Sequence, residues 1–218
     1  MRVFHFVSEK YGLDDIRRRR LKISRIQDLN DPFELLSIEL SNKQLRDAFH
    51  ATKEKLSTNR GILCFSKKWS NPVQWSHYAD KHRGLCLGFD VADNRLLTVS
   101  YTAKRLLAEV EQLLATGHSD ERTMRRLLTT KFAHWKYENE VRCFVTLEDQ
   151  DPQTKLYFAE FSDELKLAQV IVGVRSNLSR AELGGALGDL ATGVDVLKTR
   201  LAFRSFRVVR NRNQSLWT

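Results

Sequence analysis

The amino-acid sequence predicts an α+β fold with a split, mostly antiparallel central sheet and a helical insertion. Short runs rich in β-branched and aromatic residues recur along the chain between turn residues, which is typical of strands. Two helical patterns follow one another with no strand between them, at residues 104–116 and from 119 to about 135. The last two strands form a hairpin over residues 194–209. Hairpins favour antiparallel pairing, and helices grouped in sequence indicate an insertion rather than a parallel βαβ sheet.

The length and composition fit one domain over residues 1–218, with the helical insertion at about 104–135. The 218 residues suffice for a sizeable core, and 42% hydrophobic residues are ordinary for a globular protein. No apolar run approaches the ~20 residues that a membrane-spanning helix needs. Charged residues interrupt the N-terminus before a signal peptide could form. We therefore expect a cytoplasmic protein with no membrane partner.

The three cysteines, Cys64, Cys86 and Cys143, each lie alone inside an apolar run. No CxxC spacing is present, so buried free thiols are favoured over a disulfide framework or a zinc site. Apolar strands also disfavour thiolates, which argues against a cysteine nucleophile.

The formal net charge of +9 is the unusual feature of the composition. It favours an anionic partner, either a nucleic acid or an anionic substrate such as a dinucleotide. Basic residues are dense only at Arg17 to Arg20 and near the C-terminus, at Arg204, Arg207, Arg210 and Arg212. Basic faces of this kind are also common as plain solvated surface, so both interpretations stay open.

The N-terminal part is predicted to form a strand at 2–7, a short helix at 11–20 and a second strand at 21–24. A rigid corner follows at residues 30–34, with the sequence NDPFE, because Pro32 fixes its own φ and keeps Asp31 out of the helical region. Ser41 and Gln44 then predict a capping box that opens a helix to about Leu56.

A strand-helix-strand unit is expected in the middle of the chain. Residues 61–66 and 85–89 are short apolar runs between turn signals, typical of buried strands. Between them, Asn71 and Pro72 supply the N-cap and first position of a short helix that stops at Gly84. The unit brings together polar and aromatic side chains: Ser66, Trp75, His77, Tyr78 and His82.

The C-terminal part continues the sheet with strands near 142–147, 156–161 and 170–174, followed by a helix from 179 to about 190 and the closing hairpin. The pair Gly184-Gly185 lies inside the helical pattern and lacks the spacing of a phosphate-binding loop. Neither a P-loop nor a Rossmann fingerprint is therefore predicted.

Two glutamates, Glu138 and Glu140, stand at the entrance of the strand near residue 142. If the backbone is already extended there, their side chains share one face, and Arg142 continues that face and offsets their repulsion. Trp135 and Tyr137 lower the local dielectric, so at least one carboxylate should be disfavoured as an anion and suited to acid/base or cation-stabilising work. An exposed, solvated acidic pair is the alternative.

Three motifs resemble a widespread bacterial family of domains of unknown function. The family shows an NDPFE corner, a CFS strand followed by WxxYAxxHxGxCLGF, and a WxYExExR stretch. This chain carries them in the same order, at residues 30–34, 64–89 and 135–142. The resemblance names no reaction.

The order of parts is also similar to that of ADP-ribosyltransferases, which carry a His or Arg on the first strand, a Ser on a middle strand, an aromatic helix and a late ExE motif. The resemblance implies that sheet architecture, NAD as substrate and transfer of ADP-ribose to a protein or nucleic acid. It also implies a toxin or phage-defence effector, with an antitoxin or immunity protein as a partner. The chain departs from the pattern where Cys64-Phe65-Ser66 replaces an STS-like triplet.

The ADP-ribosyltransferase resemblance also implies roles for single residues. Glu140 would stabilise the oxocarbenium ion as nicotinamide leaves, and Glu138 would orient or deprotonate the acceptor. The NAD-binding residues would be His5 on the adenosine side, Ser66 supporting the glutamate, Tyr78 stacked on nicotinamide, and Trp75 and His77 beside them. Residues with a structural or acceptor-side role would be Asn30, Asp31, Glu34 and Arg142. The strands at Val3, Ile62, Leu85 and Val141 would converge on one cleft.

Two other functions compete with this hypothesis. A metal-dependent nuclease would use His77, His82 or His134 with Asp31 and Glu34, but no HxxxH or HxH spacing supports a metal site, and we expect none. A non-catalytic platform for single-stranded nucleic acid would explain Trp75, Tyr78 and the positive charge. That platform leaves the paired carboxylates without a role.

Overall fold

The computed structural model describes residues 1–34, 37–107, 120–213, 215 and 217. It groups the chain into two compact units, and each is described by itself. Unit 1 comprises Met1–Lys22, Phe65–Arg95 and Phe158–Thr218, and unit 2 comprises Ile23–Cys64 and Leu96–Tyr157. The predicted mixture of helices with a large, mostly antiparallel sheet is confirmed. Folding as one domain stays a prediction.

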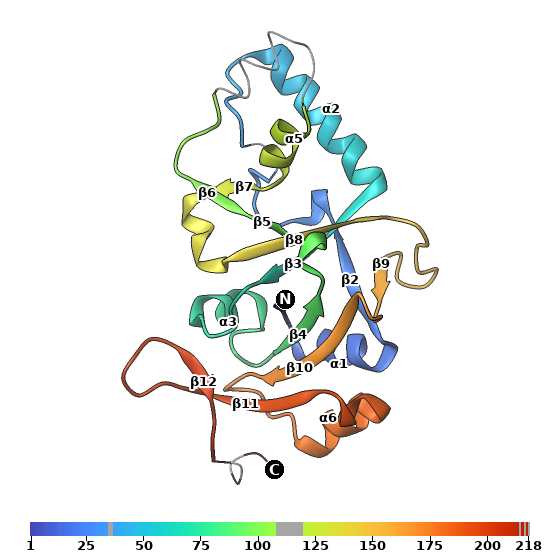
Figure 1. Ribbon diagram of the computed structural model, residues 1–218, viewed down its shortest axis with the longest axis vertical. Helices are drawn as coiled ribbons and strands as arrows, with labels where there is room; N and C mark the ends of the chain where they lie inside the picture. Colours follow the sequence, from blue (N-terminus) through green and yellow to red (C-terminus); the bar gives the residue numbers. More distant parts are fainter. Residues whose placement is uncertain (35–36, 108–119, 214, 216, 218) are drawn as a thin grey trace. The chain divides into compact units, whose positions relative to one another are not determined.

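Unit 1 is built around strand β4 (Leu85–Val91), which is buried along almost its whole length. It pairs antiparallel with β1 (Arg2–Val7) on one side and β10 (Leu165–Val172) on the other. Beyond β10 lies β11 (Asp195–Leu201), which pairs parallel with β10 (Figure 1). The β11 strand in turn pairs antiparallel with β12 (Val208–Arg210), the edge strand. Burial on both faces explains why β4 is a continuous apolar run rather than an alternating one.

Two helices of unit 1 begin at residues that cap them through their side chains. In α3 (Pro72–Tyr78), the N-cap Asn71 accepts a hydrogen bond from the Val73 N–H, with proline in the first turn. In α6 (Arg180–Leu187), Ser179 and Glu182 form a capping box. The other helical segments are α1 (Glu9–Arg18), η2 (Asp93–Arg95) and η4 (Gly188–Thr192).

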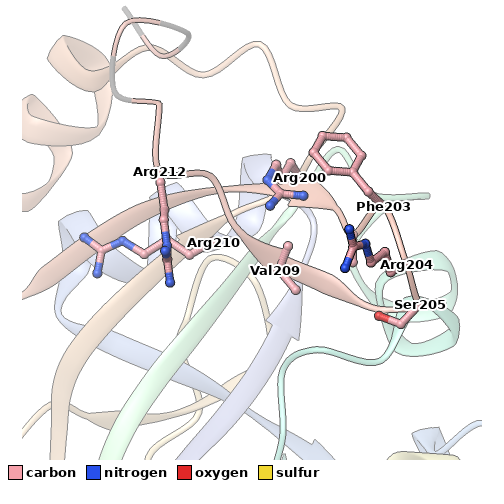
Figure 2. A pocket seen from close by; sticks show the side chains of 8 residues that line it. Arg200, Phe203, Arg204, Ser205, Val209, Arg210 and Arg212 are labelled. Atoms are coloured by element: carbon pink, nitrogen blue, oxygen red, sulfur yellow. The ribbon is translucent and has the colours of Figure 1, made fainter.

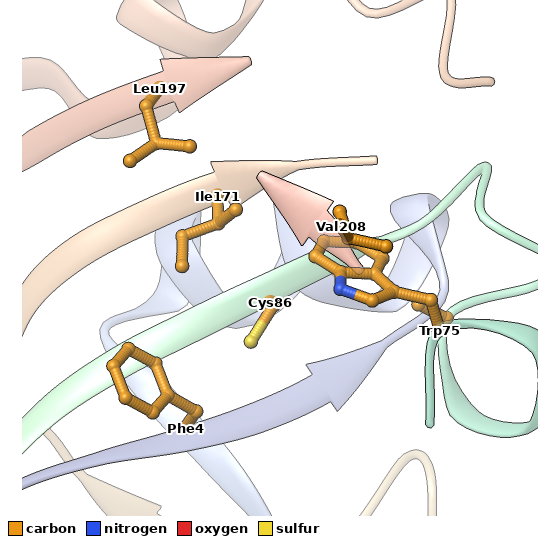
Figure 3. Packing of buried hydrophobic residues seen from close by; sticks show 7 residues of the cluster. Phe4, Trp75, Cys86, Ile171, Leu197 and Val208 are labelled. Atoms are coloured by element: carbon orange, nitrogen blue, oxygen red, sulfur yellow. The ribbon is translucent and has the colours of Figure 1, made fainter. Parts of the chain in front are cut away.

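The core of unit 1 lies on β4 and its neighbours. Trp75 is fully buried and packs in one cluster with Cys86, Ile171, Leu197 and Val208 (Figure 3). The Trp75 indole N–H donates to the carbonyl oxygen of Trp69 at 2.6 Å, so its polar atom is satisfied inside the core. This helix of the WxxYAxxHxGxCLGF motif is therefore anchored by packing.

The HxG part of the same motif fixes the end of β10 through its backbone. Gly173 N–H donates to the carbonyl oxygen of Gly84 at 3.0 Å, and Arg175 N–H donates to that of His82 at 3.0 Å. A Cβ atom on Gly173 would lie 2.2 Å from the His82 oxygen, and one on Gly84 would lie 2.2 Å from the Val7 oxygen. Glycine is required at both positions because the backbones approach too closely for a side chain.

Unit 2 contains a second set of paired strands. The strands β3 (Arg60–Ser66) and β2 (Arg20–Arg25) pair antiparallel through their residues in unit 2, although the last two residues of β3 and the first three of β2 belong to unit 1. The β3 strand neighbours β8 (Glu140–Thr146), which pairs antiparallel with β5 (Leu97–Thr98). Separately, β6 (Ser100–Thr102) pairs parallel with β7 (Thr130–Phe132). The remaining elements of unit 2 are η1 (Ile26–Asp28), α2 (Lys43–Asn59), α5 (Glu121–Leu128) and η3 (Ala133–Glu138) (Figure 1). The strand β9 (Tyr157–Glu160) begins at the last residue of unit 2 and continues in unit 1.

Several predicted helix boundaries are wrong, among them the end of α3, which is predicted at Gly84 and lies at Tyr78. The N-cap of α2 is Asn42, whose side chain accepts from Leu45 N–H, whereas Ser41 bonds to Glu39 instead of forming a capping box. The helix α1 ends at Arg18 because Arg19 adopts the left-handed conformation, with φ 55°. The C-terminal helix gives way after Leu187 to the 3₁₀ segment η4.

The predicted helical insertion is also shorter than expected. The second helix, expected to reach Trp135, ends at Leu128 and is followed by β7 and η3, because Thr129 and Thr130 turn their hydroxyls back onto helix carbonyls. Of the first helix, residues 104–107 are not helical, and Leu106 bridges Ile38; residues 108–116 lie outside the described residues. No described helix is long and apolar enough to cross a membrane.

Candidate functional site

Five charged side chains meet inside unit 2, and we call them the charge cluster: Glu34, Lys131, Glu138, Glu140 and Arg142. None of these side chains is more than 8% exposed. Two cations face three carboxylates, so the cluster carries one excess negative charge when every member is ionised. Burial of charge is costly unless the geometry of pairing is good, and the pairing in this cluster is close to ideal.

Arg142 is the centre of the charge cluster. Its Nε donates to Glu140 Oε1 at 2.8 Å, while Nη1 and Nη2 donate to the two oxygens of Glu34 at 2.6 and 3.0 Å. Nη1 also donates to the carbonyl oxygen of Leu128 at the end of α5, at 2.9 Å. The side chains of Glu140 and Arg142 lie on the same face of β8, as predicted for residues two apart in a strand.

The NDPFE corner places Glu34 in the charge cluster. Asp31 is buried, and its Oδ1 accepts a hydrogen bond from Phe33 N–H at 2.9 Å, which forms an Asx turn. Glu34 N–H donates to the carbonyl oxygen of Asp31 at 3.0 Å. The corner that Asn30 opens is thus a device that presents one carboxylate to Arg142, and the structural role expected for Asp31 and Glu34 has a physical basis.

Lys131 joins the two glutamates of the ExE motif. Its Nζ lies 2.6 Å from Glu138 Oε2 and 3.3 Å from Glu140 Oε2, and 4.8 Å from the centre of the Trp135 ring. The backbone between the glutamates is not extended, because Asn139 adopts the left-handed conformation with φ 47° and closes η3. The two carboxylates therefore do not form a strand-face pair, and they meet through the lysine instead.

The charge cluster favours the ionised form of Glu140. Burial opposes the charge on Glu140, but Arg142 and Lys131 outweigh it and hold the pKa of Glu140 below its ordinary value. Burial likewise opposes the charges on Lys131 and Arg142, yet the neighbouring carboxylates raise the pKa of each. The expectation that close packing would disfavour at least one carboxylate as an anion does not hold for Glu140, because Arg142 and Lys131 both face this carboxylate.

Two uncharged groups hold Glu140 from other elements. The Glu140 N–H donates to the Tyr101 hydroxyl oxygen at 2.8 Å, and burial raises the pKa of Tyr101 to about 12. The Cys64 thiol on β3 hydrogen-bonds the Glu140 carboxylate, and burial raises the pKa of this thiol. Cys64 is therefore a neutral donor rather than a nucleophile. All three cysteines are free, as predicted.

A pocket of about 290 Å³ in unit 2 adjoins the charge cluster through Lys131. Its lining includes the cations Lys104, Arg105 and Lys131 and the aromatic residues Phe33 and Phe132. The two rings are 53% and 42% exposed, and the Arg105 guanidinium lies 5.2 Å from the centre of the Phe33 ring. Exposed rings beside cations suit a ligand that has a planar group and a negative charge.

The other predicted site residues lie in unit 1, whereas Glu138 and Glu140 lie in unit 2. The His5 ring meets the edge of Phe65, and the rings of His77 and Tyr78 are 6.1 Å apart. Ser66 Oγ donates to the carbonyl oxygen of Lys68 at 2.8 Å, and Trp75 belongs to the core. A cleft shared by these residues and the glutamates stays a prediction.

Sequence reasoning missed Lys131, Tyr101 and Cys64 as neighbours of Glu140. The signal for Lys131 is present in the sequence, because it is the first residue of the KFAHWKYENEVR stretch, seven and nine residues before the glutamates. A lysine beside two glutamates on one local segment predicts an ion pair. Tyr101 and Cys64 carry no comparable signal, because they come from separate strands.

Asp31 and Glu34, the carboxylates considered as ligands for a metal-dependent nuclease, are engaged in other interactions. Asp31 accepts a backbone hydrogen bond, and both oxygens of Glu34 are bound by Arg142. Within the described ranges, no group of three or more His, Cys, Asp or Glu side chains has a geometry suited to a metal ion.

A family model matches part of the chain. Residues 74–143 match the model of a family described as "Protein of unknown function (DUF2971)". This range contains the whole of the WxxYAxxHxGxCLGF motif and of the WxYExExR motif, so the resemblance to a family of unknown function is confirmed there. No curated protein and no solved structure matches the chain.

Proposed function

We propose that this chain, which matches a domain of unknown function over residues 74–143, cleaves NAD at the nicotinamide-ribose bond and transfers ADP-ribose to a macromolecular acceptor. The observation that carries the proposal is Glu140, a buried carboxylate held as an anion by two cations beside a pocket of cations and aromatic rings. A preorganised anion in a site with little water is the group that stabilises a developing cation.

In the proposed reaction, the C1′–N bond of NAD breaks and its electron pair leaves with nicotinamide. The positive charge that develops on the ribose is stabilised by the Glu140 carboxylate. A nucleophilic oxygen or nitrogen of the acceptor then forms a bond to C1′. The proton of the acceptor passes to the Glu138 carboxylate, whose Oε2 lies 2.6 Å from Lys131 Nζ. When Glu138 releases this proton to water, its ion pair with Lys131 forms again.

The position of Lys131 allows NAD binding in the pocket to release Glu138 and Glu140 from their ion pairs with the lysine. It lines the pocket, and it also contacts both Glu138 and Glu140. The diphosphate of NAD is an acceptor that competes with these carboxylates for the lysine ammonium group. In this proposal the bound diphosphate draws Lys131 toward the pocket, and the Glu140 carboxylate then faces the ribose.

The test is the release of nicotinamide from NAD by purified protein, with and without added cell extract as a source of acceptors. NAD labelled in its adenylate phosphate follows the transferred group into the protein or nucleic-acid fraction. Glu140→Gln keeps the size of the side chain but removes its charge, so nicotinamide release should fall by about 10²- to 10³-fold. Glu148→Gln, an exposed residue of the same unit, is the matched control and should change nothing.

Glu140→Gln also disturbs a buried ion pair, so folding is monitored by thermal unfolding of each variant. Glu140→Asp keeps the charge but moves it away from the ribose, and should also lose activity while remaining ionised. Failure of the wild type to release nicotinamide under any of these conditions would contradict the proposal. So would equal activity of the Glu140→Gln variant and the Glu148→Gln control in folded proteins.

A further inference from the structure

We propose that the β11–β12 hairpin of unit 1 binds single-stranded nucleic acid. The loop between the strands exposes two aromatic rings almost completely, Phe203 at 90% and Phe206 at 97%. Five arginines lie between residues 200 and 212, and residues 196–218 contain no aspartate or glutamate. Two almost fully exposed rings on a uniformly basic segment combine a stacking surface with positive charge, which is the combination by which proteins bind single-stranded nucleic acid.

The base of the hairpin is fixed on the body of unit 1. Val208 is fully buried in the core cluster with Trp75 (Figure 3), and its N–H donates to the carbonyl oxygen of Ser70 at 2.9 Å. Arg207 Nη2 donates to Ser70 Oγ at 3.1 Å. The exposed rings are thus presented on an ordered scaffold, so binding does not require the whole segment to fold first.

The arginines and one ring surround a pocket of about 510 Å³ on the hairpin, lined by Arg200, Phe203, Arg204, Val209, Arg210 and Arg212 (Figure 2). The Arg200 guanidinium lies 4.4 Å from the centre of the Phe203 ring. Within the described part of the chain, the side chains of Arg204, Arg210 and Arg212 form no hydrogen bond or ion pair. Their donors are available to phosphate oxygens.

Single-stranded nucleic acid matches both features of this surface. Its phosphates pair with guanidinium groups, and its unpaired bases offer flat faces that stack on exposed rings. A duplex hides the faces of its bases, so it would use the arginines and leave the rings in water. An acidic peptide would do the same.

A membrane surface fits less well. Arg204 and Ser205 separate the two phenylalanines in sequence, so insertion of both rings would carry the Arg204 charge into the apolar layer. The arginines also line a concave pocket rather than a flat face.

The experiment measures anisotropy of a fluorescein-labelled oligothymidylate of about 12 nucleotides at salt concentrations between about 50 and 200 mM. Each phosphate contact contributes a slope of about −0.7 to log K against log salt. Replacing Arg204, Arg210 and Arg212 by Gln should therefore weaken binding at least tenfold and reduce the slope by about 2. Replacing Phe203 and Phe206 by Ser should weaken binding about tenfold or more and leave the slope unchanged.

The matched control removes three exposed arginines elsewhere, Arg17, Arg122 and Arg125, by substitution with Gln. Because it lowers the net charge equally, it separates the hairpin from diffuse attraction to a basic protein. The proposal is overturned if the control loses as much affinity as the hairpin variant, or if the phenylalanine variant binds as tightly as the wild type. It is also overturned if a duplex binds as tightly as the single strand, or if only anionic vesicles or polyglutamate bind. These measurements need no NAD, so they succeed or fail independently of the proposed transferase activity.

Discussion

Arg142 and Glu34 form a two-point ion pair across 108 residues of sequence, with Nη1–Oε1 at 2.6 Å and Nη2–Oε2 at 3.0 Å. The pair joins the NDPFE corner to the WxYExExR stretch, two motifs that look unrelated in the sequence. Both side chains are almost fully buried. This ion pair therefore explains in structural terms why the chain carries both motifs, independently of the reaction that Glu140 supports.

Removal of Arg142 should destabilise the protein strongly. Arg142→Gln leaves three buried carboxylates with Lys131 as the remaining cation, and breaking a buried ion pair in this way costs about 3–5 kcal/mol. The free energy of unfolding is measured by urea denaturation. Arg95→Gln removes an exposed ion pair with Glu164 and should cost under about 1 kcal/mol. Equal losses in the two variants would show that the charge cluster contributes no more than a surface pair.

A second prediction concerns Asp15, a buried carboxyl group in α1. Burial, with a smaller contribution from Asp14, raises the pKa of Asp15 to about 7. The folded state therefore holds a proton that the unfolded state has lost above about pH 4. This contribution to stability is complete below about pH 4 and is lost as the pH rises to about 7, by about 4 kcal/mol.

Asp15→Asn should remove this pH dependence. The variant should gain stability over the wild type at about pH 8, with little difference near pH 4, because asparagine carries no charge to bury. Chemical denaturation at both pH values gives the difference, and Asp163→Asn serves as an exposed control. A variant whose advantage is the same at both pH values would refute the raised pKa.

Two glycines should respond to alanine in opposite directions. In Gly173→Ala the new methyl group would lie 2.2 Å from the His82 oxygen, so the backbone must shift at a cost of about 1–3 kcal/mol or more. In Gly185→Ala, inside α6, nothing lies within 4 Å of the new methyl group, and the variant should gain about 0.5–1 kcal/mol. Thermal unfolding compares them directly. A stable Gly173→Ala variant would mean that the close approach to the HxG segment is not needed.

The sequence predicted the parts of the fold that depend on local patterns. The buried strands at β3 and β4, the Asn71 cap of α3 and the closing hairpin follow from apolar runs and turn residues whose physics is local. The break at Leu128 was missed because apolar and charged residues continue at helical spacing beyond it. There the threonine hydroxyls and the pairing of β6 with β7 override the pattern.

The candidate site was predictable only in part for the same reason. The spacing of Glu140 and Arg142 placed both on one strand face, and a local rule suffices for that. The ion pair of Arg142 with Glu34 and the contact of the Cys64 thiol with Glu140 depend on how distant segments of the chain pair. The spacing of residues in the sequence does not predict such pairing. Because Asn139 has a positive φ, Glu138 and Glu140 do not share a strand face as expected. Asparagine tolerates a positive φ, so its identity was a local signal for this break in the strand.

The last prediction separates the roles of the two glutamates, because Glu138 and Glu140 should fail differently. In the proposed reaction Glu140 stabilises the charge on the ribose, whereas Glu138 receives the proton of the acceptor. Glu138→Gln should therefore preserve the release of nicotinamide to water and lower the transfer of ADP-ribose to the acceptor by about 10²-fold, the range of general base catalysis. Glu140→Gln should lower both rates together. NAD affinity should barely change in either variant.

The measurement follows nicotinamide release and labelled acceptor in the same reaction, so the ratio of the two rates is independent of the amount of folded enzyme. A merely structural role for Glu138 would lower both rates in parallel and leave their ratio unchanged. Lys131→Met adds a third readout, because loss of the ammonium group that faces the pocket should raise the KM for NAD. If Glu138→Gln keeps the wild-type ratio, Glu138 serves the ion pair with Lys131 and another group must accept the proton.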